Sequence, residues 1–419
     1  MASFVFENGN QTQASSLQAT DTLVFQSATA TSLGVTFMPA TGLSASTVTL
    51  SSGSQSLTFA ASALSTATKT FLTGGGTLVL GTEAANSALS VSGNGMAASA
   101  AYGFAGADTI TVTGGAAHIA FGGSGNDILD ASGATANSDG STSTTINTGV
   151  LLFGGIGDDT ITGGAGNDRL YGNEITTVAG AVDGADTING GGGSDYIQGN
   201  AGNDILNGGD GDDRIFGGSG DDTITGGLGN DTINGNVGED NIDGGAGNDF
   251  LRGGQDDDTI LGAAGNDQLF GDLGDDTLTG GVGVDVLTGG AGADVFVFAA
   301  GDASFTTTAG APLANFYDSI ADFNVTDDSI DYAAITTGTT ANLIQTTGAT
   351  FTTVAAARTF AQSLLDANTT TGDFDVVAAQ VGNATFLFSH DQGGVTTTID
   401  SIIKLDGVTA TTLTSADLI

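Results

Sequence analysis

A nine-residue repeat is the feature that most constrains how this chain can fold. From Gly190 to Val297 the sequence divides, without insertion or deletion, into twelve consecutive nonapeptides of the pattern G-G-x-G-x-D-x-U-x, in which U is apolar. Position one is glycine and position six is aspartate in all twelve units, and position eight is always Ile, Leu or Phe. Internal periods of this kind mark solenoids, whose units bury their apolar faces only by stacking on one another.

The repeats upstream of Gly190 are less regular. Two good units run from Gly154 to Tyr171, and they are followed by an unrecognisable unit, with Thr177 in place of the aspartate, and by a degraded one. Two further copies lie at residues 122–130 and, frayed, at 103–111, and a Ser/Thr-rich insertion near 131–152 puts them out of phase. The array therefore begins irregularly.

Each nonapeptide combines a short strand with a turn. We expect the segment x-U-x to be the strand, with one side chain pointing inward, and the six preceding residues to turn the chain. Glycine allows the positive φ angles of such turns and lets one turn lie close to the next. Two units make one coil of 18 residues, and coils stack at the strand spacing of roughly 4.8 Å. The aspartates should therefore form two ladders, one along each edge.

These ladders require a counter-charge. Residues 190–297 contain 21 acidic residues and two arginines, a net charge of −19. Two carboxylates about 5 Å apart repel by roughly 0.8 kcal/mol even at the dielectric constant of water. Calcium accepts six to eight oxygens from carboxylates and backbone carbonyls, so about ten calcium ions would neutralise the array. The alternative is that the aspartates only satisfy turn amides, but asparagine or serine would serve that purpose at many sites.

The units resemble the repeats-in-toxin (RTX) family, whose motif is a calcium-binding β-helix repeat. The resemblance covers roughly residues 122–297, and its second glycine is replaced by Asn200, Asn236, Ala263 and Asp272. It implies that position-six carboxylates and nearby glycine carbonyls bind calcium between adjacent turns. The implied carboxylates are those of Asp127, Asp159, Asp168, Asp186, Asp195, Asp204, Asp213, Asp222, Asp231, Asp240, Asp249, Asp258, Asp267, Asp276, Asp285 and Asp294. The implied carbonyls belong to Gly193, Gly202, Gly211, Gly220, Gly229 and Gly247.

The flanks of the array differ from it in composition. Residues 1–101 contain β-patterned runs, DTLVF, LGVTFM, STVTL, QSLTFA and GTLVLG, that predict a β-rich domain. That domain is either a plain cap for the solenoid or a dedicated anchoring or assembly domain. The expected fold is all-β: a parallel β-roll (a calcium-stapled β-solenoid) over residues 102–298, flanked by this domain and by a β-rich capping and secretion region over 299–419.

The C-terminal region should contain one helix. The strand DVFVF, Asp294 to Phe298, is expected to close the column, and the segment from Tyr317 to Tyr332 resembles the one that caps RTX arrays. TTVAAARTFAQSLLDAN, from Thr352, has helical spacing at Val354, Phe360, Leu364 and Leu365. Three strand-like runs follow, FDVVAAQV, ATFLFSH and SIIKLDGV.

Several function classes are disfavoured. With a net charge of −41 and six basic residues, the chain cannot neutralise nucleic-acid phosphates. It has no cysteine and no apolar stretch long enough for a membrane span. Neither an H-E-x-x-H nor a G-x-S-x-G motif occurs, and His118 and His390 are expected to be bystanders. We therefore expect no enzyme.

Export is expected to use the C-terminus. The N-terminus, MASFVFENGN, has neither a basic n-region nor a long apolar h-region. In the RTX family an uncleaved C-terminal segment addresses the protein to a type I exporter, which implies a secreted protein of Gram-negative type at the cell surface. The expected partners are the export machinery, further copies of the chain in an oligomer or lattice, and cell-surface polysaccharide bridged by calcium.

The function expected is that of a self-assembling structural protein. The chain is similar in style to RTX-type surface-layer proteins, which are also free of cysteine, poor in lysine, acidic, and rich in Ala, Gly, Ser and Thr. A surface-layer role and an extracellular-matrix role cannot be separated by motif. The alternatives are an RTX adhesin or other ligand-binding module and, less favoured, an exported effector or bacteriocin.

Overall fold

The structure of the chain is a computed structural model, and it forms two compact units, Met1–Gly218 (unit 1) and Ser219–Ile419 (unit 2). This division falls inside the repeat array, so the boundaries expected at 101/102 and 298/299 stay predictions. The structure describes residues 3–5, 22–24, 34–38, 47–52, 55–60, 71–73, 76–81, 86, 89–93, 99–114, 118–134, 148–173, 183–298, 318–332, 341–367, 374–389, 401–414 and 417–418.

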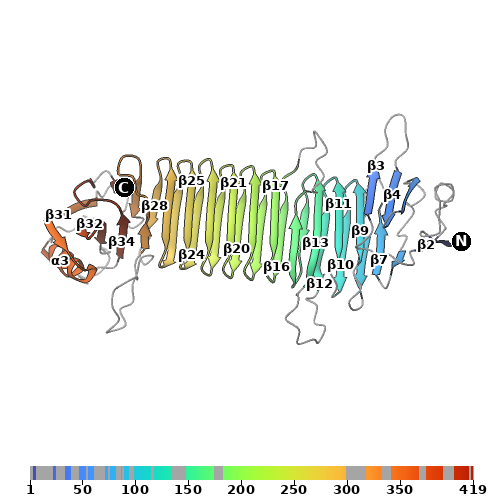
Figure 1. The fold of residues 1–419 in the computed structure, drawn as a ribbon, viewed down its shortest axis with the longest axis horizontal. Helices are drawn as coiled ribbons and strands as arrows, with labels where there is room; N and C mark the ends of the chain where they lie inside the picture. Colours follow the sequence, from blue (N-terminus) through green and yellow to red (C-terminus); the bar gives the residue numbers. More distant parts are fainter. Residues whose placement is uncertain are drawn as a thin grey trace. The chain divides into compact units, whose positions relative to one another are not determined.

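Unit 1 contains two stacks of parallel strands (Figure 1). One stack is β8 (Leu89–Gly93), β10 (Thr109–Gly114), β12 (Ile128–Ala134), β14 (Thr160–Thr162), β16 (Thr187–Gly192) and β18 (Ile205–Asp210). The other is β7 (Gly76–Leu80), β9 (Ala100–Ala105), β11 (Ile119–Ser124), β13 (Thr148–Ile156), β15 (Asn167–Tyr171) and β17 (Tyr196–Ala201). Strand β19 (Arg214–Ser219) follows at the end of the unit. Even-numbered and odd-numbered strands thus form opposite sheets of a roll.

Unit 2 repeats this construction with a constant step. Its even sheet is β20 (Thr223–Leu228), β22 (Asn241–Ala246), β24 (Thr259–Gly265), β26 (Thr277–Gly283), β28 (Val295–Phe298) and β30 (Ser329–Tyr332). Its odd sheet is β21 (Thr232–Val237), β23 (Phe250–Gln255), β25 (Gln268–Leu273), β27 (Val286–Ala291) and β29 (Asp318–Ile320). Ile224 pairs with Ile242, and Ile242 with Ile260. The expected coil of two nonapeptides is confirmed.

The core of the roll is a column of position-eight side chains. Each strand contributes one, from Ile161 to Ile215 in unit 1 and from Ile224 to Phe296 in unit 2, and all are 0–1% exposed. The strands are longer than the expected x-U-x, since most have six residues, such as TITGGL in β20. The prediction that positions one to three belong to the turn was wrong. Glycine backbones at these positions still pair in register, as Gly227 does with Gly245.

The column does not end at Phe298, contrary to the sequence prediction. Strand β28 pairs in parallel with β30, and β27 pairs with β29. Ile320 and Ile330 extend the buried column and are both 0% exposed. The segment expected to cap the array therefore supplies another pair of strands, because its two D-S-I tripeptides place an apolar side chain two residues after an aspartate, as the repeats do.

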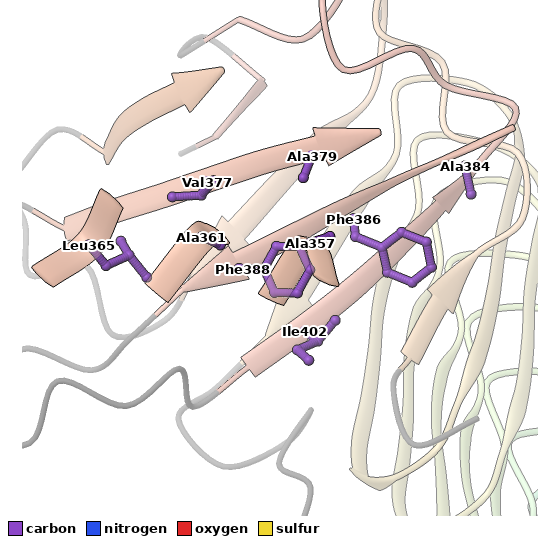
Figure 2. Packing of buried hydrophobic residues seen from close by; sticks show 9 residues of the cluster. All are labelled: Ala357, Ala361, Leu365, Val377, Ala379, Ala384, Phe386, Phe388 and Ile402. Carbon is purple, nitrogen blue, oxygen red and sulfur yellow. The ribbon is translucent and has the colours of Figure 1, made fainter. Parts of the chain in front are cut away.

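The C-terminal region of unit 2 has an apolar core of an ordinary kind (Figure 2). The core lies between α3 (Val354–Ala367) and the sheet of β31 (Ala341–Phe351), β32 (Phe374–Val381), β33 (Ala384–Ser389) and β34 (Ser401–Asp406). The expected helix and three strands are thus confirmed. The face that α3 buries is Ala357, Ala361 and Leu365, whereas Phe360 is 38% exposed. No helix among the described residues has the length and apolarity needed to cross a membrane.

The N-terminal region contributes short strands. The five β-patterned runs each contain one: β2 (Thr22–Val24), β3 (Gly34–Met38), β4 (Thr47–Ser52), β5 (Gln55–Ala60) and β7. Strands β3, β4 and β5 form an antiparallel sheet, β1 (Ser3–Val5) pairs with β2, and β6 (Phe71–Thr73) forms a hairpin with β7. With a single helix among the described elements, the all-β fold class is confirmed.

Candidate metal sites in two carboxylate ladders

The position-six aspartates form ladders at the turns that lead into the strands. We call a ladder even or odd by the number of the strand that follows each aspartate. The even ladder is Asp108, Asp127, Asp159, Asp186 and Asp204 in unit 1, and Asp222, Asp240, Asp258, Asp276, Asp294 and Asp328 in unit 2. The odd ladder is Asp168, Asp195 and Asp213 in unit 1, and Asp231, Asp249, Asp267, Asp285 and Asp318 in unit 2. Every one is 0–3% exposed except Asp328, at 7%.

One oxygen of each carboxylate is committed to the neighbouring coil. The backbone amide of Asp249 donates to Oδ1 of Asp267 at 2.8 Å, and that of Asp267 donates to Oδ1 of Asp285 at 2.8 Å. The amide of Asp195 donates to Oδ1 of Asp213 in the same way, at 2.7 Å. The carboxylates therefore do satisfy turn amides, as the alternative reading of the sequence supposed. Asp168 and Asp328 accept from backbone amides with both oxygens, whereas the other bonds described here use Oδ1 alone.

The second carboxylate oxygen, Oδ2, shows whether these aspartates only cap turns or also need a cation. In ten aspartates Oδ2 is buried and has no hydrogen-bond partner among the described residues: Asp108, Asp127, Asp159, Asp186, Asp195, Asp240, Asp249, Asp258, Asp267 and Asp276. A buried carboxylate oxygen without a partner is costly, and such atoms call for an explanation such as an ion. Asparagine could replace Oδ1, but it could not supply this charge.

The motif requires glycine at positions one and four for two different structural reasons. At position one, a Cβ on Gly235 would lie 2.0 Å from Oδ2 of Asp240, so only glycine leaves room for the carboxylate. At position four, Gly247 has φ +148° and its Cβ would lie 1.6 Å from the carbonyl oxygen of Gly229. The carbonyl oxygen of Gly229 thus faces the corresponding glycine of the next coil.

The substituted second glycines keep the backbone of the motif. Asn200, Asn236, Ala263 and Asp272 all have φ between +73° and +83°. Asp256, which replaces a position-four glycine, has φ +74°. The turns are therefore preserved at every departure that the structure describes, whereas Thr177 lies outside the described residues.

Burial makes the ladder carboxylates hard to ionise in the absence of a cation. It raises the pKa from 3.8 to about 9 for Asp186 and to about 8 for Asp159 and Asp258. It raises the pKa to about 7 for Asp127, Asp195 and Asp249, and to about 6 for Asp168, Asp204, Asp240, Asp276 and Asp294. Neighbouring carboxylates add to the effect, as Asp159 and Asp204 do at Asp186.

Two ion pairs of the described residues lie outside the ladders: Arg252 with Asp272, and Lys404 with Asp406. Within the same part of the chain, no three His, Cys, Asp or Glu side chains gather closely enough to hold a metal by themselves. A cation at the ladders would therefore combine carboxylates with backbone carbonyls, which is the mixed, all-oxygen ligand set that calcium accepts.

The structure adds residues that the sequence prediction missed. Asp318 and Asp328 extend the ladders, since they accept hydrogen bonds from the amides of Asp285 (2.9 Å) and Asp294 (3.2 Å). Asp108, in the frayed first copy, accepts from the backbone and side-chain amides of Asn86. A D-x-U pattern marks all three aspartates, so a search for that tripeptide without the glycines would have found them.

The odd ladder begins without carboxylates. Its first positions are occupied by Ser99, His118 and Val150. Nδ1 of His118 accepts from the amide of Ser99 at 3.2 Å, its Nε2 has no partner among the described residues, and burial lowers the pKa of the imidazole. His118 is thus a buried member of the ladder, and its expected lack of a catalytic role stays a prediction. His390 lies outside the described residues.

A parallel β-roll with two ladders of buried carboxylates is a cation-binding β-solenoid. The protein family described as "RTX calcium-binding nonapeptide repeat (4 copies)" matches residues 151–174, 181–215, 207–242, 234–269 and 270–303. The repeat array of this chain therefore consists of RTX calcium-binding nonapeptide repeats. No curated protein matches the chain.

Solved structures offer three likenesses. Two are solution structures of subunits of the Azotobacter vinelandii mannuronan C5-epimerase: AlgE6R3 (27% identity, 42% of this chain, 80% of that one, TM-score 0.26) and AlgE6R2 (25%, 41%, 91%, 0.24). The third is the crystal structure of the extracellular lipase LipA from Serratia marcescens (14% identity, 74% of this chain, 67% of that one, TM-score 0.24). With TM-scores this low, the likenesses carry no further conclusion.

Proposed function

We propose that this protein is an exported, non-enzymatic structural protein whose β-roll folds when it binds calcium outside the cell. The observation that carries the proposal is the set of buried Oδ2 atoms without a partner, of which Asp249 and Asp258 are examples. Burial raises the pKa of Asp249 to about 7 and that of Asp258 to about 8, so holding them ionised in the folded roll at neutral pH costs stability that a cation beside them would restore. The calcium levels of extracellular fluids, on the order of 0.1 to 1 mM, would supply it, whereas cytoplasmic levels would not.

The same ligands suggest how calcium would stabilise the roll. Each ion would replace the repulsion between stacked carboxylates by attraction to both of them, and the carbonyl oxygens of glycines such as Gly229 and Gly247 would complete its oxygen shell. About ten ions remain our expectation for residues 190–297, from their net charge of −19. The ladder positions Asp318 and Asp328 extend that expectation to residue 328.

The proposed role of the folded roll is to support assembly into a surface layer or an extracellular matrix. At a net charge of −41, free molecules repel one another, and calcium would cancel most of the charge of the array. Identical rigid units with complementary ends can then form open, repeating contacts. We expect those contacts in the flanking regions and not along the ladders, since residues 1–101 carry a net charge of −2 and residues 299–419 one of −11, against −19 for residues 190–297.

The test is to follow purified full-length protein by light scattering and electron microscopy in millimolar calcium and in chelator. We expect ordered sheets or filaments in calcium, and their dissolution in chelator. A protein that folds in calcium but stays monomeric at high concentration would argue against the structural role and favour the adhesin. A protein with the same β content in both conditions would contradict calcium-dependent folding itself.

A further inference from the structure

The start of the odd sheet in unit 1 is stabilised differently from the rest of the array. The residues that we call the neutral rungs are Ser99 and His118, which immediately precede β9 and β11, and Val150, which lies near the start of β13. Ser99 and His118 are 0% exposed and Val150 is 3% exposed, so these side chains fill the buried positions that aspartates fill elsewhere. None of them carries a charge that needs a metal, since burial keeps the imidazole of His118 neutral.

A stack of aromatic rings covers the same three strands. Tyr102, Phe121, Phe153 and Tyr171, which we call the ring stack, have centroids 4.7, 4.8 and 4.9 Å apart and planes within 12° of parallel. The rings stand at paired positions, since Phe121 is the partner of both Tyr102 and Phe153, and Phe153 is the partner of Tyr171. Stacked aromatic pairs stabilise a sheet beyond the area that they bury.

The ring stack ends where the carboxylates begin. Tyr171 follows Asp168, the first aspartate of the odd ladder. Beyond it, the next two ring contacts, Tyr171 with Tyr196 and Tyr196 with Phe216, lengthen to 5.6 Å and tilt by 42° and 43°. In-register stacking therefore covers the neutral rungs and stops at the first charged one.

The even ladder keeps its aspartates over these coils, as Asp108, Asp127 and Asp159. Three consecutive coils here bury three ladder carboxylates, whereas three coils of regular repeats bury six. Half as many buried carboxylates therefore need a cation where the rings stack.

We propose that the neutral rungs and the ring stack form a calcium-independent start of the β-roll. Strands β9, β11 and β13 fold without the ion and present an ordered edge, at β13, on which calcium adds β15 and the following coils. Because a solenoid gains order by adding coils to an existing one, such an edge removes the cost of starting a new coil. This inference rests on the proposed function in one respect, that calcium orders the aspartate coils.

Hydrogen exchange of the full-length chain, read by mass spectrometry in calcium and in chelator, tests the proposal. We expect protection of β9, β11 and β13 to change by less than about tenfold on chelation, and that of β16–β18 to fall by more than about a hundredfold. Loss of protection in all of these strands on chelation would overturn the inference and leave the proposed function intact. Full protection of β16–β18 in chelator would overturn the proposed function.

Two variants test the ring stack and the neutral rungs separately. Phe121→Ala removes the central ring, and it should abolish the chelator-resistant protection of β9–β13 while calcium still protects β16–β18. Phe250→Ala is the matched control, because Phe250 contacts Phe270 among aspartate coils, with ring centroids 5.1 Å apart and planes tilted by 38°. It should leave β9–β13 unchanged. Val150→Asp places a carboxylate in a neutral rung, and it should make protection of β11 and β13 depend on calcium. Unchanged chelator resistance in both Phe121→Ala and Val150→Asp would overturn the proposal.

Discussion

Unit 2 contains two kinds of β-structure that solve the same stability problem differently. In the roll, each strand from β20 to β28 buries one position-eight side chain, and the turns bury carboxylates. In the C-terminal region, nine residues from α3, β32, β33 and β34 form one apolar cluster, with Phe386, Phe388 and Ile402 among them (Figure 2). The cluster derives its stability from apolar burial, whereas the roll buries charge that only a cation can compensate. The two regions should therefore respond differently to the same perturbation.

Calcium removal should separate the two regions most strongly. In chelator at neutral pH, we expect residues 186–298 to lose their β-structure, because carboxylates such as Asp258 and Asp276 must then be buried either protonated or charged without a cation, and both cost stability. The C-terminal region, residues 341–406, should stay folded. Hydrogen exchange resolved by peptide would measure both together. Equal protection of the roll with and without calcium would contradict the contrast.

In chelator, lowering the pH should restore part of the β-structure of the roll, and it should not affect the C-terminal region in this way. The folded pKa values of the ladder aspartates are raised, for example to about 9 for Asp186 and about 8 for Asp258. A group with a raised folded pKa stabilises the folded state fully below its unfolded pKa, near 3.8, and this stabilisation is lost as pH rises through the folded value. In chelator, β content should therefore increase from pH 9 to pH 4. Circular dichroism would measure this β content. A roll that unfolds further in acid would contradict the raised pKa values of the ladder aspartates.

A cavity in the apolar cluster should affect the C-terminal region and leave the roll intact. Phe388 is 0% exposed, and Phe388→Ala should cost about 3–5 kcal/mol of that region's unfolding free energy, through lost burial and an unfilled cavity. Urea unfolding in calcium and in chelator should give the same loss. Phe360→Ala is the control, because Phe360 is 38% exposed. A loss that depended on calcium would mean that the two regions are stabilised together.

The smallest effect expected is that of a single glycine. Gly247→Ala combines φ +148° with a Cβ 1.6 Å from a carbonyl oxygen, whereas Gly382→Ala, between β32 and β33, combines φ +63° with open space. Backbone strain of this type costs about 1–3 kcal/mol. We expect Gly247→Ala to raise the calcium concentration needed for folding and Gly382→Ala to leave it unchanged. Equal calcium midpoints in both variants would show that close stacking of the turns is unimportant.

The sequence by itself determined the regular part of the roll. A strict nine-residue period fixes which residues face inward, and a coil of 18 residues fixes which aspartates stack. That is why the ladder from Asp231 to Asp285, the buried Ile/Leu column and the positive-φ turns could be predicted before any coordinate. The helix α3 was predictable from its spacing, although the face that it buries, Ala357, Ala361 and Leu365, was not.

Only the tertiary structure decided the two ends of the roll. At the C-terminal end, Asp285 bonds to Asp318, 33 residues away, and Asp294 bonds to Asp328, 34 residues away. The regular step of 18 residues, from which the array could be predicted, is absent there. His118 likewise occupies an aspartate position, and so does Val150, although Val150 lies within the residues near 131–152 that the sequence assigned to an insertion. A sequence period shows contacts only while the chain between them keeps one length. Where a loop of another length intervenes, strand pairing alone shows which side chains share a ladder.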